Sequence, residues 1–193
     1  MLRRLYDWTL SMTAKPGARW GLGGISFAES SFFPIPPDVM LIPMCLARPD
    51  RALQFAMITT LASVAGGVFG YLIGALLYES VGVWVIELYG LTEKAVVFRE
   101  VFNEQGYWVI LLAGFTPIPY KLITITAGFT GYDVVLFIVL SAIARGARFF
   151  LLAGLLYAFG ESIRRLIDRH FALLTTAVGV AGVGGFAAVK LLF

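Results

Sequence analysis

Two long stretches without charge constrain the fold more than any other feature of the sequence. Ala52–Tyr78 and Val134–Ala144 contain no charged residue, and only 14% of the whole chain is charged, against about a quarter in a soluble domain. A soluble protein of 193 residues could not bury this much apolar surface. Backbone groups in lipid must be hydrogen-bonded internally, and α-helices meet this need. We therefore expect an all-α integral membrane protein.

Three apolar segments are long enough to cross a bilayer, which needs roughly 20 residues. They are residues 52–78, 134–159 and 171–193. A glycine ladder runs along the first of them, at Gly66, Gly70 and Gly74, and this spacing favours close helix packing. The chain is then a single membrane domain, residues 1–193, with about three full spanning helices.

Two other apolar segments are interrupted by prolines. Residues 18–47 contain Pro34, Pro36 and Pro37, and residues 107–130 contain Pro117 and Pro119. Proline stops a helix, and each half-segment is then too short to span a bilayer. Both segments are predicted to be re-entrant hairpins, with the prolines at the tips, packed inside protein or against a wet cavity.

The two interrupted segments contain an internal repeat. Phe32–Asp38 (FFPIPPD) aligns without gaps with Phe115–Lys121 (FTPIPYK), with identities at the phenylalanine, both prolines and the isoleucine. One spanning helix separates the copies, so the hairpins would enter from opposite faces as an inverted repeat. Broken segments at matching positions indicate the central binding site of a transporter.

The charged flanks predict how the chain lies in the membrane. Residues 1–14 resemble an interfacial helix, and the acidic residues 79–105 resemble an amphipathic segment outside the membrane, with a helix from Thr92 to Gly106. Basic residues concentrate in 1–19 and 161–170. The positive-inside rule places the N-terminus in the cytoplasm and the C-terminus outside it, in a multi-pass inner (plasma) membrane protein.

Five charged residues fall within the apolar segments: Glu29, Asp38, Lys121, Arg145 and Arg148. A charge in hydrocarbon costs a few kcal/mol or more, so such residues face a partner or a cavity. One interpretation is purely structural: Asp38 pairs with Lys121, Glu29 pairs with one arginine, and the pairs lock the hairpins together. That interpretation leaves one of the three cations without a carboxylate.

A functional interpretation uses the surplus positive charge. Lys121, Arg145 and Arg148 are suited to bind a phosphate group, and helix N-termini restarting after the prolines would add N–H donors. Glu29 and Asp38 would couple this binding to protons, because a carboxylate removed from water favours its protonated form.

The remaining composition excludes several functions. The single histidine, His170, has no partner ligands for a metal, and no cofactor motif or catalytic cluster is present, so we expect neither a metal site nor an enzyme. The net charge of +3 reflects membrane flanks and not nucleic-acid binding. Homo-oligomerisation is left open.

The motif Glu-x-x-x-x-Pro-x-Pro-Pro-Asp, from Glu29 to Asp38, followed by a glycine-spaced helix and a second Phe-x-Pro segment, resembles the DedA family. That family is also called VTT-domain or SNARE-associated, and Phe115–Lys121 followed by Thr126-Ala127-Gly128 looks like its YqaA-like branch. The resemblance implies opposed hairpins, proton dependence, resistance to cationic peptides, and translocation of undecaprenyl phosphate or phospholipids. One departure is that Gly114 stands where many members carry an arginine, and Lys121 stands where they carry a second.

Together these observations predict a transporter or flippase of a phosphate-bearing lipid, such as undecaprenyl phosphate or another anionic phospholipid, with proton coupling. Three alternatives remain: a proton- or ion-coupled carrier of a small solute, an uncoupled lipid scramblase, and a structural scaffold.

Overall fold

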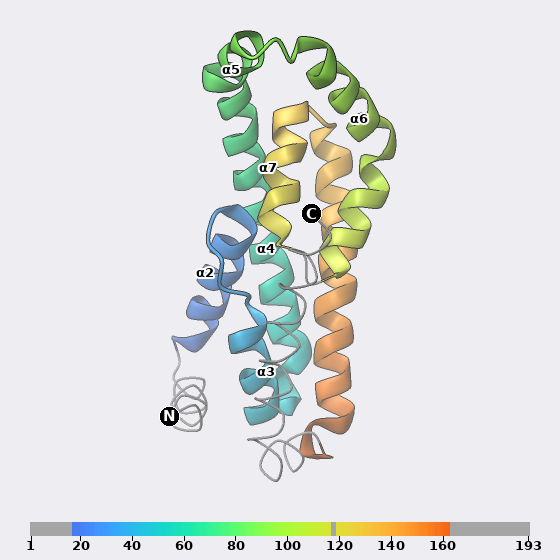
Figure 1. Cartoon of the computed structure of the whole chain (residues 1–193). Helices are drawn as coiled ribbons and strands as arrows, with labels where there is room; N and C mark the ends of the chain where they lie inside the picture. The colour runs from blue at the N-terminus through green and yellow to red at the C-terminus, as the bar shows by residue number, and fades with distance from the viewer. Residues whose placement is uncertain (1–16, 117–118, 163–193) are drawn as a thin grey trace, which may run out of the picture.

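The structure is a computed structural model that describes residues 17–116 and 119–162, and this part of the chain is helical and contains no strand. The helices form an elongated bundle (Figure 1). The predicted interfacial helix 1–14, the predicted span 171–193, Pro117 and His170 lie outside the described residues.

The first half of the bundle is built around one long helix. The elements are α2 (Ala18–Ser31), α3 (Asp38–Ala47), the short 3-10 turn η1 (Pro49–Arg51), α4 (Ala52–Leu77), the π-helical turn η2 (Tyr78–Gly82) and α5 (Val83–Leu88). From η1 to α5 the chain is one continuous helix, Pro49–Leu88. The predicted span 52–78 is thus part of this longer helix.

The second half contains α6 (Thr92–Phe115), α7 (Tyr120–Thr130) and the helix Val134–Ser162. The start at Thr92 agrees with the sequence, but the predicted helix end at Gly106 is wrong. No break separates residues 79–105 from 107–130, because α6 continues from the end of the first range into the start of the second. Gly106 is buried, and a Cβ there would lie 2.8 Å from the ring of Tyr132. This glycine therefore permits close packing inside a helix and does not end one.

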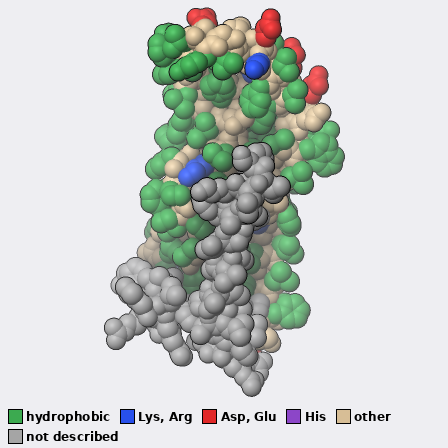
Figure 2. All heavy atoms as spheres, viewed as in Figure 1, with side chains coloured by type: hydrophobic (Ala, Val, Ile, Leu, Met, Phe, Trp, Pro, Cys, Tyr) green, Lys and Arg blue, Asp and Glu red, His purple; other side chains and the backbone are tan. Residues whose placement is uncertain are grey.

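Two of these helices are long and apolar enough to span a membrane: Pro49–Leu88 and Val134–Ser162. Only 33% of the most apolar window of each is buried inside the molecule, so most of their apolar side chains face outward. Figure 2 shows apolar side chains along the sides of the bundle and acidic ones at the end formed by α5 and α6. This distribution suits a bundle with lipid around its sides.

Both proline-containing breaks lie where the sequence predicts them. Helix α2 ends at Ser31, and α3 begins directly after Pro37, so the first break covers residues 32–37. Phe115 ends α6, and α7 begins directly after Pro119. The path of each helix pair relative to a membrane, and hence the re-entrant and inverted arrangement, stays a prediction.

Glycines bring α4 against its neighbours on both sides. A Cβ on Gly66 would overlap the backbone carbonyl of Phe27 in α2, and a Cβ on Gly74 would overlap the carbonyl of Ile125 in α7. Gly70, between them, would meet the Thr124 hydroxyl. Helix α4 therefore holds α2 and α7 at backbone contact distance, which positions the two helix breaks relative to each other.

Candidate functional site

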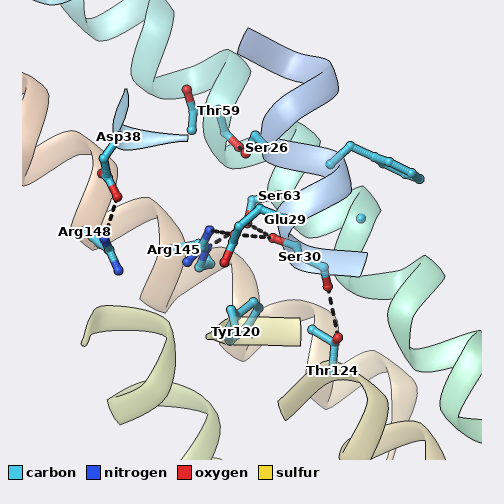
Figure 3. A network of polar contacts seen from close by, with 12 residues as sticks. Ser26, Glu29, Ser30, Asp38, Thr59, Ser63, Tyr120, Thr124, Arg145 and Arg148 are labelled. Atoms are coloured by element: carbon cyan, nitrogen blue, oxygen red, sulfur yellow. Dashed lines mark hydrogen bonds and ion pairs between the residues drawn. The ribbon is translucent and has the colours of Figure 1, made fainter. Parts of the chain in front are cut away.

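The two helix breaks enclose a polar cavity of about 320 Å³. Helices α2, α3, α7 and Val134–Ser162 all contribute to its wall. The five charged residues singled out from the sequence line it together with prolines of both breaks: Glu29, Asp38, Lys121, Arg145 and Arg148, with Pro34, Pro36, Pro37 and Pro119. Figure 3 shows the polar contacts around Glu29, Asp38, Arg145 and Arg148. Segments more than 80 residues apart thus form one site.

Arg145 is the most buried charge of the site, with 1% of its surface exposed. Its Nη2 donates to Oε2 of Glu29 at 2.6 Å, and its Nε donates to Oγ of Ser63 at 2.7 Å. The guanidinium also lies over the rings of Tyr120 and Phe149, at 4.9 and 4.7 Å from their centroids. Such cation–π contacts are strongest away from water. Arg145 is therefore held in one position and is not free to snorkel to an interface.

Two serines complete a closed ring with this ion pair. Ser30 Oγ lies 2.7 Å from Ser63 Oγ and donates to Oε2 of Glu29 at 3.2 Å. Ser63 accepts from Arg145, so its own hydrogen is left for Ser30, and Ser30 passes its hydrogen to Glu29. Both arms of the ring, one direct and one through the two serines, then run from Arg145 as the donor to Glu29 as the acceptor. Sequence analysis missed both serines, although hydroxyl groups in apolar helices commonly hydrogen-bond across helices.

Arg148 and Asp38 form a second, less buried ion pair. Arg148 Nη2 donates to Oδ2 of Asp38 at 2.6 Å, and Nη1 donates to the carbonyl of Thr116 at 2.8 Å. The two side chains are 22% and 18% exposed. The alternative in which Asp38 pairs with Lys121 is therefore wrong. The arginine lies where one helix restarts and another ends, so it reaches the carboxylate and the terminal carbonyl at once.

Lys121 is the remaining cation of the cavity. Among the described residues it makes no salt bridge. It occupies the second position of α7, and a cation at a helix N-terminus faces the positive end of the helix dipole. The Thr124 hydroxyl donates to the carbonyls of Lys121 and Ser30, each at 3.0 Å, and ties this turn of α7 to α2. The surplus charge predicted from the sequence therefore resides at Lys121.

The charged side chains of the cavity carry a net positive charge. Its walls carry three cations and two carboxylates, and both carboxylates are engaged by arginines. Helices α3 and α7 both begin at its wall, and a helix N-terminus favours a nearby negative charge. In the described part of the chain, no group of three or more histidine, cysteine or acidic side chains is arranged to hold a metal ion.

Comparison with known proteins places these features in a family. The family model of the VTT domain matches residues 35–158, which include the second half of the first proline break, the whole of the second break and most of the helix that carries the arginines. An uncharacterised protein of Haemophilus influenzae is 35% identical over 189 residues, covering 96% of each chain. An uncharacterised protein of Histophilus somni is 34% identical over 186 residues, covering 96% of this chain and 97% of its own. No solved structure matches the chain.

The match covers well over half of the chain, and the similarity to these relatives extends over nearly its whole length. The motif that suggested the resemblance, Glu29 to Asp38, supplies two of the cavity's charged residues. The chain belongs to the VTT-domain family, the DedA family of membrane proteins.

Proposed function

We propose that this protein moves a phosphate-bearing lipid across the membrane, with the phosphate held in the polar cavity at Lys121. The supporting observation is Lys121 at the start of α7, which makes no salt bridge with any residue that the structure describes and lies in a cavity whose two carboxylates are both paired with arginines. A lysine at a helix N-terminus is unfavourable unless an anion lies nearby. A phosphate would relieve that repulsion and accept hydrogen bonds from the backbone N–H groups of α7 and α3.

In this proposal the two proline breaks are opposed re-entrant hairpins that meet near the middle of the inner membrane. The N-terminus is cytoplasmic and the C-terminus is outside, as the basic flanks predict. The cavity then offers a fixed positive charge at a depth where a bare phosphate would be very unfavourable. The lipid tail remains in an apolar environment throughout.

Proton coupling follows from the second ion pair. Protonation of Asp38 would remove the charge that holds Arg148 and would free this guanidinium for the phosphate. Lys121, Arg145 and Glu29 face the same cavity, and the ring around Glu29 keeps that carboxylate paired with Arg145. We therefore assign the moving proton to Asp38, with Glu29 as the more strongly held carboxylate.

The first experiment measures lipid movement in reconstituted vesicles. Labelled undecaprenyl phosphate and labelled phosphatidylglycerol are followed between leaflets for the wild type, Lys121→Gln and the control Lys94→Gln. Lys94 is an exposed lysine on α6 and lies outside the cavity. We expect Lys121→Gln to slow movement at least tenfold and Lys94→Gln to match the wild type. Equal rates for all three proteins would refute the proposed site.

The second experiment separates coupled transport from the alternatives. An imposed pH gradient should accelerate the wild type, and Asp38→Asn should remove this response. If the pH gradient does not change the rate of lipid movement by the wild type, the protein is an uncoupled scramblase. Uptake of glycerol phosphate without lipid movement would instead identify a small-solute carrier, and release of inorganic phosphate from the lipid would identify an enzyme.

A further inference from the structure

A second hollow adjoins the polar cavity and differs from it in chemistry. It has a volume of about 390 Å³ and is lined by apolar side chains of three helices: Ile42 of α3, Phe115 of α6, and Leu151, Leu152 and Leu155 of helix Val134–Ser162. Leu151, Leu155 and Phe115 are each about half exposed, at 53%, 46% and 50%. This apolar groove therefore opens sideways, toward the region that lipid would occupy.

The apolar groove and the polar cavity share two residues. Asp38 and Arg148 belong to the walls of both, so their ion pair forms the boundary between them. Two atoms beside this boundary, Asp38 Oδ1 and Thr116 Oγ1, are buried and have no hydrogen-bond partner in the described part of the chain. Buried polar atoms without partners are unfavourable. A hydrogen-bond donor at this junction would satisfy the carboxylate oxygen, and the Thr116 hydroxyl can itself donate to a ligand oxygen.

We propose that the apolar groove holds the hydrocarbon chain of the ligand whose phosphate lies at Lys121. This inference rests on the proposed function and deepens it. It defines the ligand as a long-chain amphiphilic phosphate whose phosphate and hydrocarbon chain are both bound by the protein. The support for it is that the two hollows adjoin at Asp38 and Arg148, with positive charge on one side and apolar side chains on the other. One described groove accommodates one chain, so a single-chain phosphate is sufficient for recognition.

The test uses water-soluble probes, because a chain leaving lipid for the groove gains little from the hydrophobic effect. Inorganic phosphate, butyl phosphate and octyl phosphate are titrated calorimetrically into the full-length protein in detergent micelles. Each methylene buried from water contributes roughly a fourfold gain in affinity. Because the groove is half open, we expect octyl phosphate to bind about tenfold to a hundredfold more tightly than butyl phosphate.

Two tryptophan variants decide where the chain lies. Leu151→Trp fills the groove, whereas Ile143→Trp adds the same bulk on the same helix at a similarly exposed position that lines neither hollow. We expect Leu151→Trp to abolish the preference for octyl phosphate while inorganic phosphate still binds. Ile143→Trp should behave as the wild type, and this control accounts for partition into the micelle.

The results distinguish this inference from the proposed function. If inorganic phosphate fails to bind the wild type, or binds Lys121→Gln equally well, the phosphate site itself is wrong. If phosphate binds at Lys121 but chain length has no effect, the apolar groove does not hold the chain. A preference for octyl phosphate that survives in Leu151→Trp would overturn the inference in the same way.

Discussion

The ion pair between Arg145 and Glu29 gives the sharpest quantitative prediction. The Arg145 side chain is 2% exposed and the Glu29 side chain 11% exposed, with 2.6 Å between Nη2 and Oε2. Replacing Glu29 by glutamine keeps the size of the side chain and removes its charge. Arg145 is clamped between two aromatic rings and bonded to Ser63, so it cannot turn toward water. The substitution therefore leaves a buried, uncompensated cation.

Breaking one partner of a buried ion pair typically costs about 3–5 kcal/mol of unfolding free energy. We expect Glu29→Gln to lie near 3 kcal/mol, because the amide oxygen can still accept one hydrogen bond from Arg145. Asp50 and Arg51 provide the control: they lie 3.6 Å apart with side chains 72% and 44% exposed. An exposed pair contributes roughly 0–1 kcal/mol, so Asp50→Asn should have little effect.

The assay is unfolding in mixed micelles by increasing sodium dodecyl sulfate, followed by circular dichroism. The double variant Glu29→Gln/Arg145→Gln completes a mutant cycle and should be less destabilised than the sum of its single variants by more than about 1 kcal/mol. Additive effects, or a loss for Glu29→Gln no larger than that for Asp50→Asn, would refute the conclusion that this pair is desolvated and coupled.

Two further predictions use the same unfolding assay. Gly74→Ala should lower stability by about 1–3 kcal/mol or more, because its methyl group would overlap a backbone carbonyl of α7. Gly154→Ala has open space and should stay within about 0.5 kcal/mol, and equal losses would contradict the packing argument. Ser63→Ala should cost about 1–3 kcal/mol, since the buried guanidinium loses its acceptor. Ser80→Ala, whose exposed hydroxyl bonds only to its own helix, is the matched control and should be nearly neutral.

Several features of the fold follow from local chemistry and were predictable. Closely spaced prolines interrupt a helix, so both breaks were placed correctly, at residues 32–37 and between Phe115 and Tyr120. The single Pro43, by contrast, lies inside α3. The end of α6 was not predictable in the same way. A glycine weakens a helix without forcing it to stop, and at Gly106 the packing against Tyr132 decides that the helix continues.

The candidate site was likewise predictable only in part. The rarity of charge in apolar segments was enough to select Glu29, Asp38, Lys121, Arg145 and Arg148. The pairing of Glu29 with an arginine was predicted correctly, but which arginine it is and the partner of Asp38 were not predictable, because they depend on the distances between the helix breaks and helix Val134–Ser162. The glycine contacts along α4 set part of that geometry by holding α2 and α7 close. Ser30 and Ser63 were missed because the role of a serine hydroxyl depends on the group to which it hydrogen-bonds, and the sequence does not show that group.

The sequence by itself determined that the chain lies in a membrane, where its helices break, and that the charged residues of its apolar segments include one more cation than anions. Each of these depends on residue type and spacing alone. Only the tertiary structure decided which cation carries that excess. Arg145 and Arg148 lie within hydrogen-bond distance of Glu29 and Asp38, and Lys121 does not. The physical reason is that charge adds up along the chain, whereas an ion pair depends on distance in space.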